Sequence, residues 1–151
     1  MDGTDHRYDS LKLENQLCFP LYVASKEVIR KYKPLLDRID LTYTQYIAMM
    51  VIWEKKKIRV TDLSASLFLD TGTVSPLIRK LAAKGYVQIV RSNADERVQL
   101  VELTEAGERL RDEALAVPKA MITNRCICLE PAEALAFRKL LMKVIQGDSG
   151  S

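Results

Sequence analysis

Asp70-Thr71-Gly72-Thr73-Val74-Ser75-Pro76-Leu77-Ile78-Arg79-Lys80-Leu81 is the stretch that decides the fold of this chain. Asp70-Thr71-Gly72-Thr73 precedes a predicted helix, in which apolar residues recur at helical spacing from Val74 until Gly85, a favoured helix stop. We expect Pro76 in the first turn of this helix, where proline is tolerated. A shorter helix is predicted from Thr61 to about Leu67. Two helices joined by a short turn form a helix-turn-helix.

The residues that follow predict a β-hairpin. Residues 86–92 and 97–103 alternate between apolar and polar side chains, and Asn93-Ala94-Asp95-Glu96 lies between them as a turn. Upstream, Thr42-Tyr43-Thr44-Gln45 is a capping-box pattern that opens another helix, and a short strand is expected at residues 58–60. Short helices followed by a hairpin indicate a winged helix-turn-helix.

Longer helices are predicted on both sides of this unit. One runs from about Phe19 or Pro20 to Ile39, one is capped by Thr104 and runs to about Asn124, and one runs from Glu130-Pro131 to near Gln146. Their apolar faces have nothing to cover them in one small domain, so we expect them to pack on a second copy. The fold class is therefore mainly α with a β-hairpin wing. The expected organisation is a mobile N-terminal tail (1–10), a helical dimerisation region (11–41 and 104–146), a winged helix-turn-helix domain (42–103) and a C-terminal tail (147–151).

Composition narrows the function classes. The chain has 151 residues, 48% of them hydrophobic, and a net charge of +3, as expected for an ordinary globular protein. No apolar run approaches the length of a membrane span, and the polar start is unlike a signal peptide. Three cysteines fit a reducing, cytoplasmic setting better than a disulfide-stapled secreted one. The single histidine, His6, argues against a Ser-His-Asp triad and against a histidine-based metal site.

The predicted helix-turn-helix carries a local basic surface. Four cations and no acid lie between residues 70 and 95, as phosphate contacts require. Small polar side chains at the start of a recognition helix can hydrogen-bond to bases or phosphates, and cations one to two turns later in the helix can reach phosphates. An arginine on the tip of the wing can enter a minor groove, where a nearby acid orients its guanidinium. The alternative interpretation is ordinary helix capping and a solvated charged face. The candidate DNA-binding residues are Thr71, Thr73, Ser75, Arg79, Lys80, Arg91, Asp95 and Arg97.

The three cysteines are the remaining candidate chemistry. Cys18 lies in Leu17-Cys18-Phe19-Pro20-Leu21-Tyr22, close to the expected start of the first long helix, while Cys126 and Cys128 lie more than a hundred residues away. Such cysteines are often only small core residues. A Cys-x-Cys metal site is the weaker interpretation because no histidine lies nearby, and we expect neither a metal nor a cofactor.

Several segments together resemble a known family. They are Leu13-Glu14-Asn15-Gln16-Leu17-Cys18-Phe19, Leu41-Thr42-Tyr43-Thr44-Gln45-Tyr46, Leu69 to Leu77, and Asp95-Glu96-Arg97 with Leu103-Thr104. The chain resembles the MarR family of winged-helix repressors over residues 11–146, and within it the thiol-based organic-hydroperoxide sensors of the OhrR type. The Asp-x-Arg wing is general to MarR proteins, whereas cysteine followed by Phe-x-Leu-Tyr with spaced tyrosines is specific to the peroxide-sensing branch.

The resemblance implies a homodimer on an inverted-repeat DNA operator, with organic hydroperoxide as the signal. Cys18 would be the peroxidatic cysteine, and Tyr32 and Tyr43 would hydrogen-bond its thiolate from the partner subunit, with Tyr22 as a further neighbour. Arg97 and Asp95 would be the wing's minor-groove arginine and its orienting acid. Pro20 departs from the family, in which many members have a small residue at this position, so the helix start can differ here.

The expected switch is thiol oxidation. The reactive form is the thiolate, which the helix N-terminus and phenol hydroxyls can stabilise; no cation neighbours Cys18 in sequence, so the tyrosines are the better candidates. Attack on a peroxide gives a sulfenic acid, which a second thiol can trap as a disulfide. Relatives with two cysteines carry the resolving one near Cys126 and Cys128 on the partner chain, and we favour Cys126. A mixed disulfide with a small thiol is the other possibility.

Other function classes stay open at this point. A MarR-type regulator can respond to a small phenolic or aromatic ligand, in which case Cys18 would have no part in the response. Hypochlorite or quinones, as alternative signals, attack the same thiolate. A thiol peroxidase or oxidoreductase is disfavoured because the chain has neither Cys-x-x-Cys nor a βαβ order. We therefore expect a DNA-binding repressor and not an enzyme.

Overall fold

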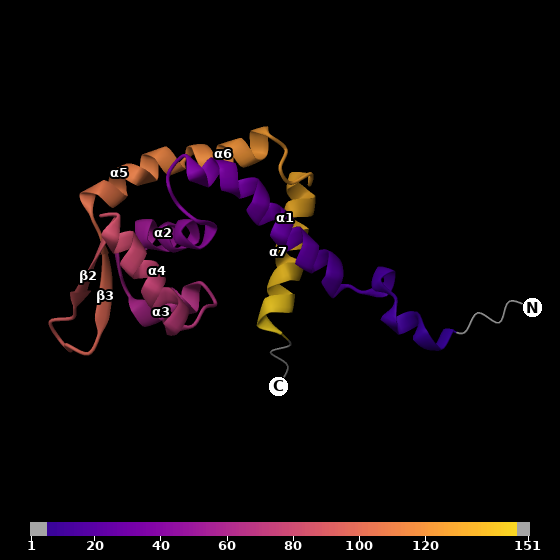
Figure 1. Cartoon of the computed structure of the whole chain (residues 1–151), viewed down its shortest axis with the longest axis horizontal. Helices are drawn as coiled ribbons and strands as arrows, with labels where there is room; N and C mark the ends of the chain where they lie inside the picture. Colours follow the sequence, from indigo (N-terminus) through magenta and orange to yellow (C-terminus); the bar gives the residue numbers. More distant parts are fainter. Residues whose placement is uncertain (1–5, 148–151) are drawn as a thin grey trace, which may run out of the picture.

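The computed structural model describes residues 6–147 of the chain (Figure 1). Its helices and strands follow the predicted order. They are the 3-10 helices η1 (His6–Leu11) and η2 (Leu13–Asn15), then α1 (Cys18–Asp37), α2 (Tyr43–Lys55), β1 (Lys57–Arg59), α3 (Val60–Ser66), α4 (Thr71–Ala83), β2 (Val87–Arg91), β3 (Gln99–Leu103), α5 (Glu105–Ala114), α6 (Ala116–Thr123) and α7 (Pro131–Gln146).

Local capping signals fix the ends of the two central helices. Thr42 Oγ1 accepts from the backbone N–H of Gln45 at 3.2 Å, and Gln45 Oε1 accepts from the N–H of Thr42 at 3.0 Å, so the predicted capping box of α2 is confirmed. Asp70 Oδ1 caps α4 by accepting from the N–H of Thr73 at 2.7 Å. At the other end of α4, Gly85 has φ +84 and closes a Schellman motif, as its predicted role as a helix stop requires.

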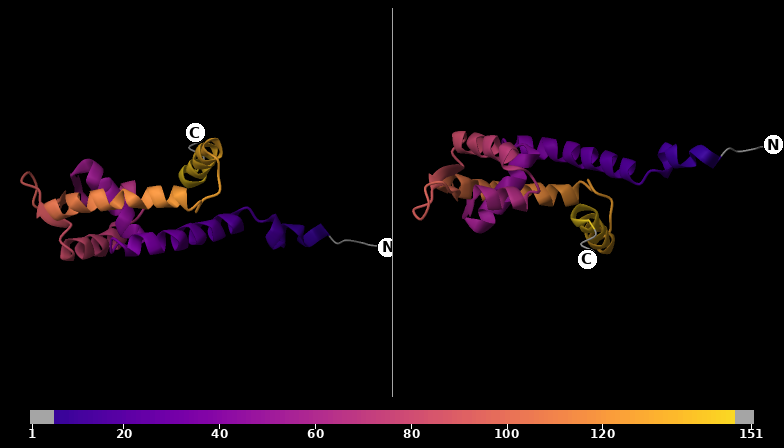
Figure 2. Two further views of the ribbon diagram at one scale, coloured as in Figure 1. Left: turned by 90° about the horizontal axis from the view of Figure 1, so that it is seen from above. Right: turned by 90° about the horizontal axis from the view of Figure 1, so that it is seen from below.

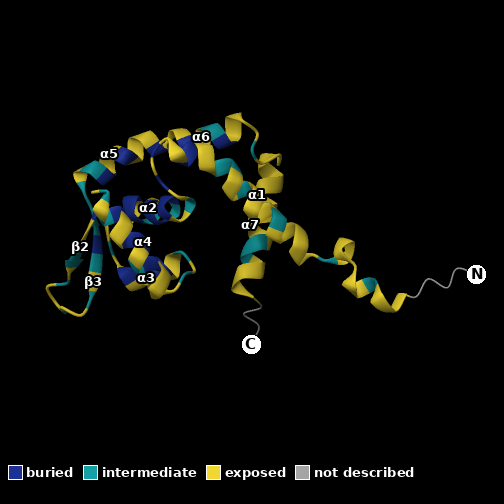
Figure 3. Cartoon of the chain, viewed as in Figure 1, coloured by how far each residue is buried: buried dark blue, intermediate teal, exposed yellow. Residues whose placement is uncertain are grey.

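The core lies among α2, α3 and α4 and the C-terminal part of α1 (Figure 3). Fully buried side chains come from each of these elements and from the sheet: Leu36, Met49, Ile52, Leu63, Val74, Ile78, Leu81 and Val101. The sheet has the strand order β1-β3-β2 and is antiparallel throughout. Val101 in the central strand faces Ile58 on one side and Ile89 on the other. The predicted hairpin and short strand are therefore both present, and the fold class is confirmed.

Two details of the predicted helices were wrong, and both involve proline. Pro76 lies in the second turn of α4, not the first, because Asp70 caps the helix immediately before Thr71. The single helix predicted from 105 to 124 is two helices, α5 and α6, which join at Leu115. Pro118 accounts for this break, since it has no N–H to donate to the carbonyl of Ala114 four residues earlier.

The end segments stand away from this core (Figures 1 and 2). No residue of α7 is buried, and neither η1 nor η2 has a buried residue. Figure 3 accordingly shows α7 and the N-terminal segment as almost entirely exposed. Of the predicted mobile tails, residues 1–5 and 148–151 lie outside the described residues, whereas residues 6–10 belong to η1.

Candidate DNA interface and sensor thiol

The recognition-helix candidate presents its polar side chains in two rows. Thr71, Ser75 and Arg79 recur every four residues along one face of α4, and Thr73 and Lys80 share another. Ser75 is half-buried and the other four are exposed. Asp70 is occupied as the helix cap, so it is a structural residue of this end. The exposed N-terminal end of α4 is free to approach a base edge or a phosphate.

The wing carries an arginine that a carboxylate holds in place. Arg97 Nε and one terminal nitrogen donate to the two oxygens of Asp95 at 3.1 and 3.2 Å, and the backbone N–H of Arg97 donates to the same carboxylate at 3.0 Å. Arg97, as a hydrogen-bond donor, lowers the pKa of Asp95 below its usual range. The side chain of Arg97 is still 91% exposed. Its guanidinium is therefore oriented without being covered, as predicted from the sequence.

A basic hollow joins the recognition helix to the wing. Its volume is about 340 Å³, and its walls come from α3, α4, the sheet and the loop between β2 and β3: Arg59, Val60, Thr61, Thr71, Ser75, Arg91, Arg97, Val98 and Gln99. The hollow brings together four of the predicted DNA-binding residues: Thr71, Ser75, Arg91 and Arg97. Arg91 also donates to the carbonyl of Glu96 at 2.8 Å, so it closes the hairpin as well.

Arg59 is a member of this hollow that the sequence did not single out. It lies at the end of β1, and its charge also contributes to the lowered pKa of Asp95. The only sequence signal was the basic run from Lys55 to Arg59, which by itself indicates a connector. Pairing of β1 with β3 is what carries Arg59 next to the wing.

Cys18 is the first residue of α1 and is exposed, which confirms its predicted place at the helix start. The first turn of α1 contains no acidic residue, and Leu17 makes no side-chain cap there. The positive end of the helix is therefore not neutralised by its own sequence. The stretch around Cys18 is apolar and uncovered, with Leu17 80% exposed.

A cluster of three tyrosines lies at the opposite end of α1. The ring centroids of Tyr32 and Tyr43 are 5.1 Å apart, and Tyr46 lies 5.9 Å from Tyr32 and 6.5 Å from Tyr43. Burial, with smaller contributions from Tyr43 and Cys126, raises the pKa of Tyr32, so its hydroxyl keeps its proton and is a hydrogen-bond donor at neutral pH. The sequence missed Tyr46, whose signal was its spacing of three residues from Tyr43.

Cys18 and the tyrosine cluster are far apart within one chain. Tyr32 lies fourteen positions after Cys18 in one continuous helix, which is about 21 Å along the helix axis. Tyr22 does not join the cluster either; it is exposed, and the ammonium of Lys26 lies 4.3 Å from its ring centroid. Contact between Cys18 and these tyrosines therefore needs a second chain.

The two C-terminal cysteines differ in their surroundings. Cys126 is half-buried against the core, close enough to Tyr32 to affect its pKa. Cys128 is exposed, and its thiol donates to the carbonyl of Arg125 at 3.4 Å. All three cysteines are free thiols. Across residues 6–147, no three His, Cys, Asp or Glu side chains are grouped closely enough to hold a metal ion.

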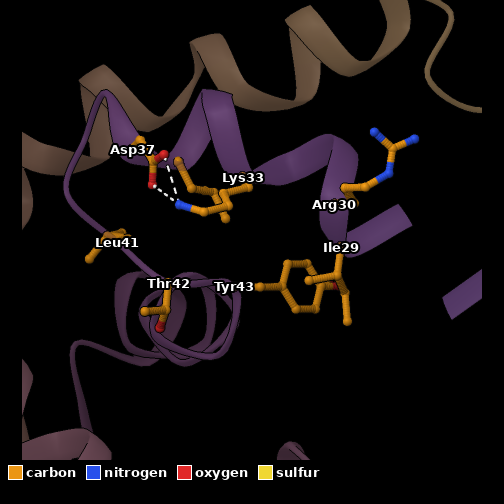
Figure 4. Close-up of a pocket in the computed structure, with 8 residues that line it drawn as sticks. Ile29, Arg30, Lys33, Asp37, Leu41, Thr42 and Tyr43 are labelled. Carbon is orange, nitrogen blue, oxygen red and sulfur yellow. Dashed lines mark hydrogen bonds and ion pairs between the residues drawn. The ribbon is translucent and has the colours of Figure 1, made fainter. Parts of the chain in front are cut away.

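An apolar cavity of about 260 Å³ lies beside Tyr43, between α1 and α2 (Figure 4). Ile29, Leu36 and Leu41 contribute to its walls, and Tyr43 points along it toward Ile29. The cations at its rim are engaged with acids on the same helix: Arg30 with Glu27 at 2.6 Å and Lys33 with Asp37 at 3.0 Å.

The start of α2 is tied to the end of the recognition helix. Lys84, which follows α4, donates to Gln45 Oε1 at 3.2 Å and to the carbonyl of Asp40, and its ammonium lies 3.4 Å from the Asp40 carboxylate. The same Gln45 oxygen accepts from the N–H of Thr42, the residue before Tyr43. A shift of the α1–α2 turn would therefore act on α4 directly.

None of the helices between residues 6 and 147 is both long and apolar enough to span a bilayer.

Comparison with known proteins bears out the resemblance. A family model described as the transcriptional regulator SarA/Rot matches residues 30–114. The organic hydroperoxide resistance transcriptional regulator of Bacillus subtilis (strain 168) is 40% identical over 118 residues, which is 78% of this chain and 80% of that regulator. The structure of overoxidized AbfR from Staphylococcus epidermidis bound to DNA is 26% identical, covers 93% of this chain and 98% of its own, and has a TM-score of 0.74. A mutant of Escherichia coli MarR complexed with operator DNA shares the fold at 22% identity and a TM-score of 0.77, covering 85% of this chain and 92% of its own. The chain belongs to the SarA/Rot family of MarR-like winged-helix transcriptional regulators.

Proposed function

We propose that this regulator is a homodimeric repressor that organic hydroperoxides release from an inverted-repeat operator by oxidising Cys18. One observation carries the proposal: within one chain, an exposed thiol lies at the start of α1 and a cluster of tyrosines lies at the other end of that helix. An antiparallel meeting of two copies of α1 would bring each thiol to the other chain's tyrosines.

The uncovered apolar surface supports the dimer. Apolar residues along α7, in the segment before α1 and in the first turn of α1 are all exposed: Leu11, Leu13, Leu17, Phe19, Leu135, Phe137, Leu140, Val144 and Ile145. Monomeric proteins rarely expose an apolar surface of this extent. We assign 11–41 and 104–146 to the dimerisation region and 42–103 to the DNA-binding domain.

The DNA-binding role rests on the basic hollow and the ends of α4 and the wing. Thr71, Thr73 and Ser75 are assigned to base edges and phosphates, and Arg79, Lys80 and Arg91 to phosphates. The Asp95–Arg97 pair suits a minor groove, because the guanidinium is oriented before DNA arrives and remains exposed. The two α4 helices of a dimer would lie about 34 Å apart to fit successive major grooves.

The proposed reaction begins with the Cys18 thiolate. Its sulfur attacks the distal oxygen of the hydroperoxide, the O–O bond breaks, and the alkoxide leaves and takes a proton as the alcohol. The hydroxyls of Tyr32 and Tyr43 of the partner subunit would donate to the thiolate, and Tyr22 would line the pocket. The resulting sulfenic acid is resolved by Cys126 or Cys128 of the other chain, or by a small thiol.

Disulfide formation would then pull on the region that sets the spacing of the two α4 helices. The start of α2 holds Tyr43 and is hydrogen-bonded through Gln45 to Lys84 at the end of α4. Movement at the tyrosine cluster therefore reaches the recognition helix through a short path. A few ångströms of change in the spacing would spoil the fit to DNA. The same thiolate would also respond to hypochlorite or quinones.

A regulator that answers a small phenolic or aromatic ligand is the second candidate. One observation favours it: the apolar cavity beside Tyr43 has a volume that fits one small ring. The cations at its rim are already paired, so nothing there selects an anionic ligand over a neutral one.

Fluorescence anisotropy on a duplex selected from a random pool by the reduced protein tests both candidates. Wild type and Cys18→Ser are compared with and without cumene hydroperoxide, and a reductant is added last. We expect the peroxide to release wild type, the reductant to restore its binding, and the variant to stay bound. Equal release of the variant would overturn the Cys18 switch, and release by a phenol alone would favour the second candidate.

A further inference from the structure

A long-range hydrogen bond joins α1 to the loop between α6 and α7. Lys31 Nζ donates to the backbone carbonyl of Cys126 at 2.7 Å, across 95 residues of sequence and in a half-buried setting. Lys31 is the neighbour of Tyr32 on α1. The bond therefore fixes the backbone of Cys126 next to the tyrosine cluster.

The loop is folded so that this hydrogen bond fixes the position of Cys126 and not that of Cys128. The N–H of Cys126 donates to the carbonyl of Met121 at 3.0 Å, and Arg125 adopts a left-handed φ of 49° that turns the chain at this point. Cys126 is held from both its N–H and its carbonyl and is half-buried. Cys128, two residues later, is exposed.

Geometry also dictates which Cys18 can reach Cys126. A disulfide needs Cα atoms within about 7 Å. Cys126 is bonded to the residue next to Tyr32, which lies about 21 Å along α1 from Cys18 of the same chain. As long as α1 stays folded, a disulfide between Cys18 and Cys126 must join two chains.

We propose that Lys31 is a positioning residue for the resolving step. Lys31 holds Cys126 beside Tyr32, so that the sulfenic acid of Cys18 from the partner subunit condenses with Cys126 and not with Cys128. This inference rests on the proposed function. In the step, the Cys126 sulfur attacks the Cys18 sulfur, the S–O bond breaks, and the hydroxyl leaves as water with the thiol proton. Lys31 touches no reacting atom, since its ammonium is bonded to the backbone carbonyl.

The contribution of Lys31 is to keep the thiol close to its target. Without this bond the loop between Thr123 and Pro131 would sample more conformations, and the effective concentration of the Cys126 thiol at the tyrosine cluster would fall. Formation of the Cys18 sulfenic acid does not involve the loop, so its rate should not depend on Lys31. Separate rates for the two steps therefore distinguish positioning from a general loss of structure.

The test uses the full-length dimer with cumene hydroperoxide and measures both steps. Trapping by a dimedone probe reports the sulfenic acid on Cys18, and quenched non-reducing electrophoresis with peptide mass mapping reports the disulfide. We expect Lys31→Met to slow disulfide formation about tenfold, as expected when one hydrogen bond from a charged donor is lost, while sulfenic acid forms at the wild-type rate. Lys31→Arg keeps a donor and should restore most of the rate.

Lys55→Met is the matched control, because it removes an exposed lysine whose described contact is an ion pair with the neighbouring Glu54 at 3.7 Å. It should resolve like wild type. Resolution of Lys31→Met at the wild-type rate, or equal slowing in Lys55→Met, overturns the role of Lys31 and leaves the peroxide sensor intact. If wild-type Cys18 forms no sulfenic acid at all, the proposed function itself is wrong.

Discussion

Gly107 is the position at which a single methyl group should disturb the fold most. It is buried in the first turn of α5, and a Cβ there would lie 2.2 Å from the carbonyl oxygen of Tyr86 and 2.7 Å from Leu103 Cδ1. The first of these neighbours is backbone, so it cannot move aside by rotating a side chain. Gly107→Ala must therefore push α5 away from the start of the hairpin. The carbonyl of Gly107 also accepts from Trp53 Nε1 at 2.8 Å, and that bond would be strained as well.

The expected loss in the free energy of unfolding follows from these contacts. Overpacking against backbone costs about 3 kcal/mol, and loss of the Trp53 hydrogen bond adds about 1 kcal/mol. The higher helix propensity of alanine relative to glycine offsets about 1 kcal/mol of this loss. Gly107→Ala should therefore lower the free energy of unfolding by about 3 kcal/mol.

Urea unfolding at fixed protein concentration measures this difference, and the fluorescence of Trp53 reports it because Trp53 is the only tryptophan in the chain. Gly72→Ala is the control, since the Cβ there has no backbone neighbour from outside its own helix within 4 Å and meets only the capping oxygen of Asp70, at 3.2 Å. It should cost less than about 1 kcal/mol, a small effect by the standard of point substitutions. If Gly107→Ala is as stable as wild type, our placement of α5 against the hairpin is incorrect.

Three further outcomes are expected. Arg97→Ala should weaken DNA binding about tenfold and reduce the slope of log affinity against log salt by about one, and unchanged affinity would exclude Arg97 from the interface. Lys84→Met removes the hydrogen bond to Gln45 that links the start of α2 to the end of α4. Cys18 should oxidise at the wild-type rate, but the difference in DNA affinity between the reduced and the oxidised protein should become smaller. An unchanged difference in affinity would contradict transmission through this hydrogen bond. Lys56, as a hydrogen-bond donor, lowers the pKa of Glu108 in the folded protein. The stability that this ion pair contributes is therefore present above the ordinary pKa of a carboxyl group, and it is lost as the pH falls through the lowered pKa of Glu108. Urea midpoints measured between pH 6 and pH 3 should therefore fall less in Glu108→Gln than in wild type, and equal falls would argue against the pair.

The sequence predicted those parts of the fold that depend on local signals. The capping box at Thr42 and the stop at Gly85 act within a few residues, so they could be identified without knowledge of the tertiary structure. The cap at Asp70 is also local, but the helix was expected to begin later, near Val74. The wing pair of Asp95 and Arg97 is equally local, because donor and acceptor are only two positions apart in the chain.

Features that depend on distant contacts were missed. Arg59 reaches the basic hollow only because β1 pairs with β3, and Lys31 meets Cys126 across 95 residues. Tyr46 joins the tyrosine cluster through the packing of α2 on α1, which periodicity alone does not separate from ordinary core packing. The break between α5 and α6 did have a local cause in Pro118, but the apolar spacing continues through it and favoured one long helix.

The central claim is that oxidation of Cys18 in one chain, beside the tyrosines of the other, releases DNA. The most direct measurement is a titration of the DNA-bound dimer with cumene hydroperoxide, in which DNA release and the state of each cysteine are followed in the same samples by anisotropy and peptide mass mapping. We expect release to track loss of the Cys18 thiol and a Cys18–Cys126 linkage that joins two chains. DNA that stays bound after Cys18 is fully oxidised, or that leaves while Cys18 is still a thiol, would contradict the claim.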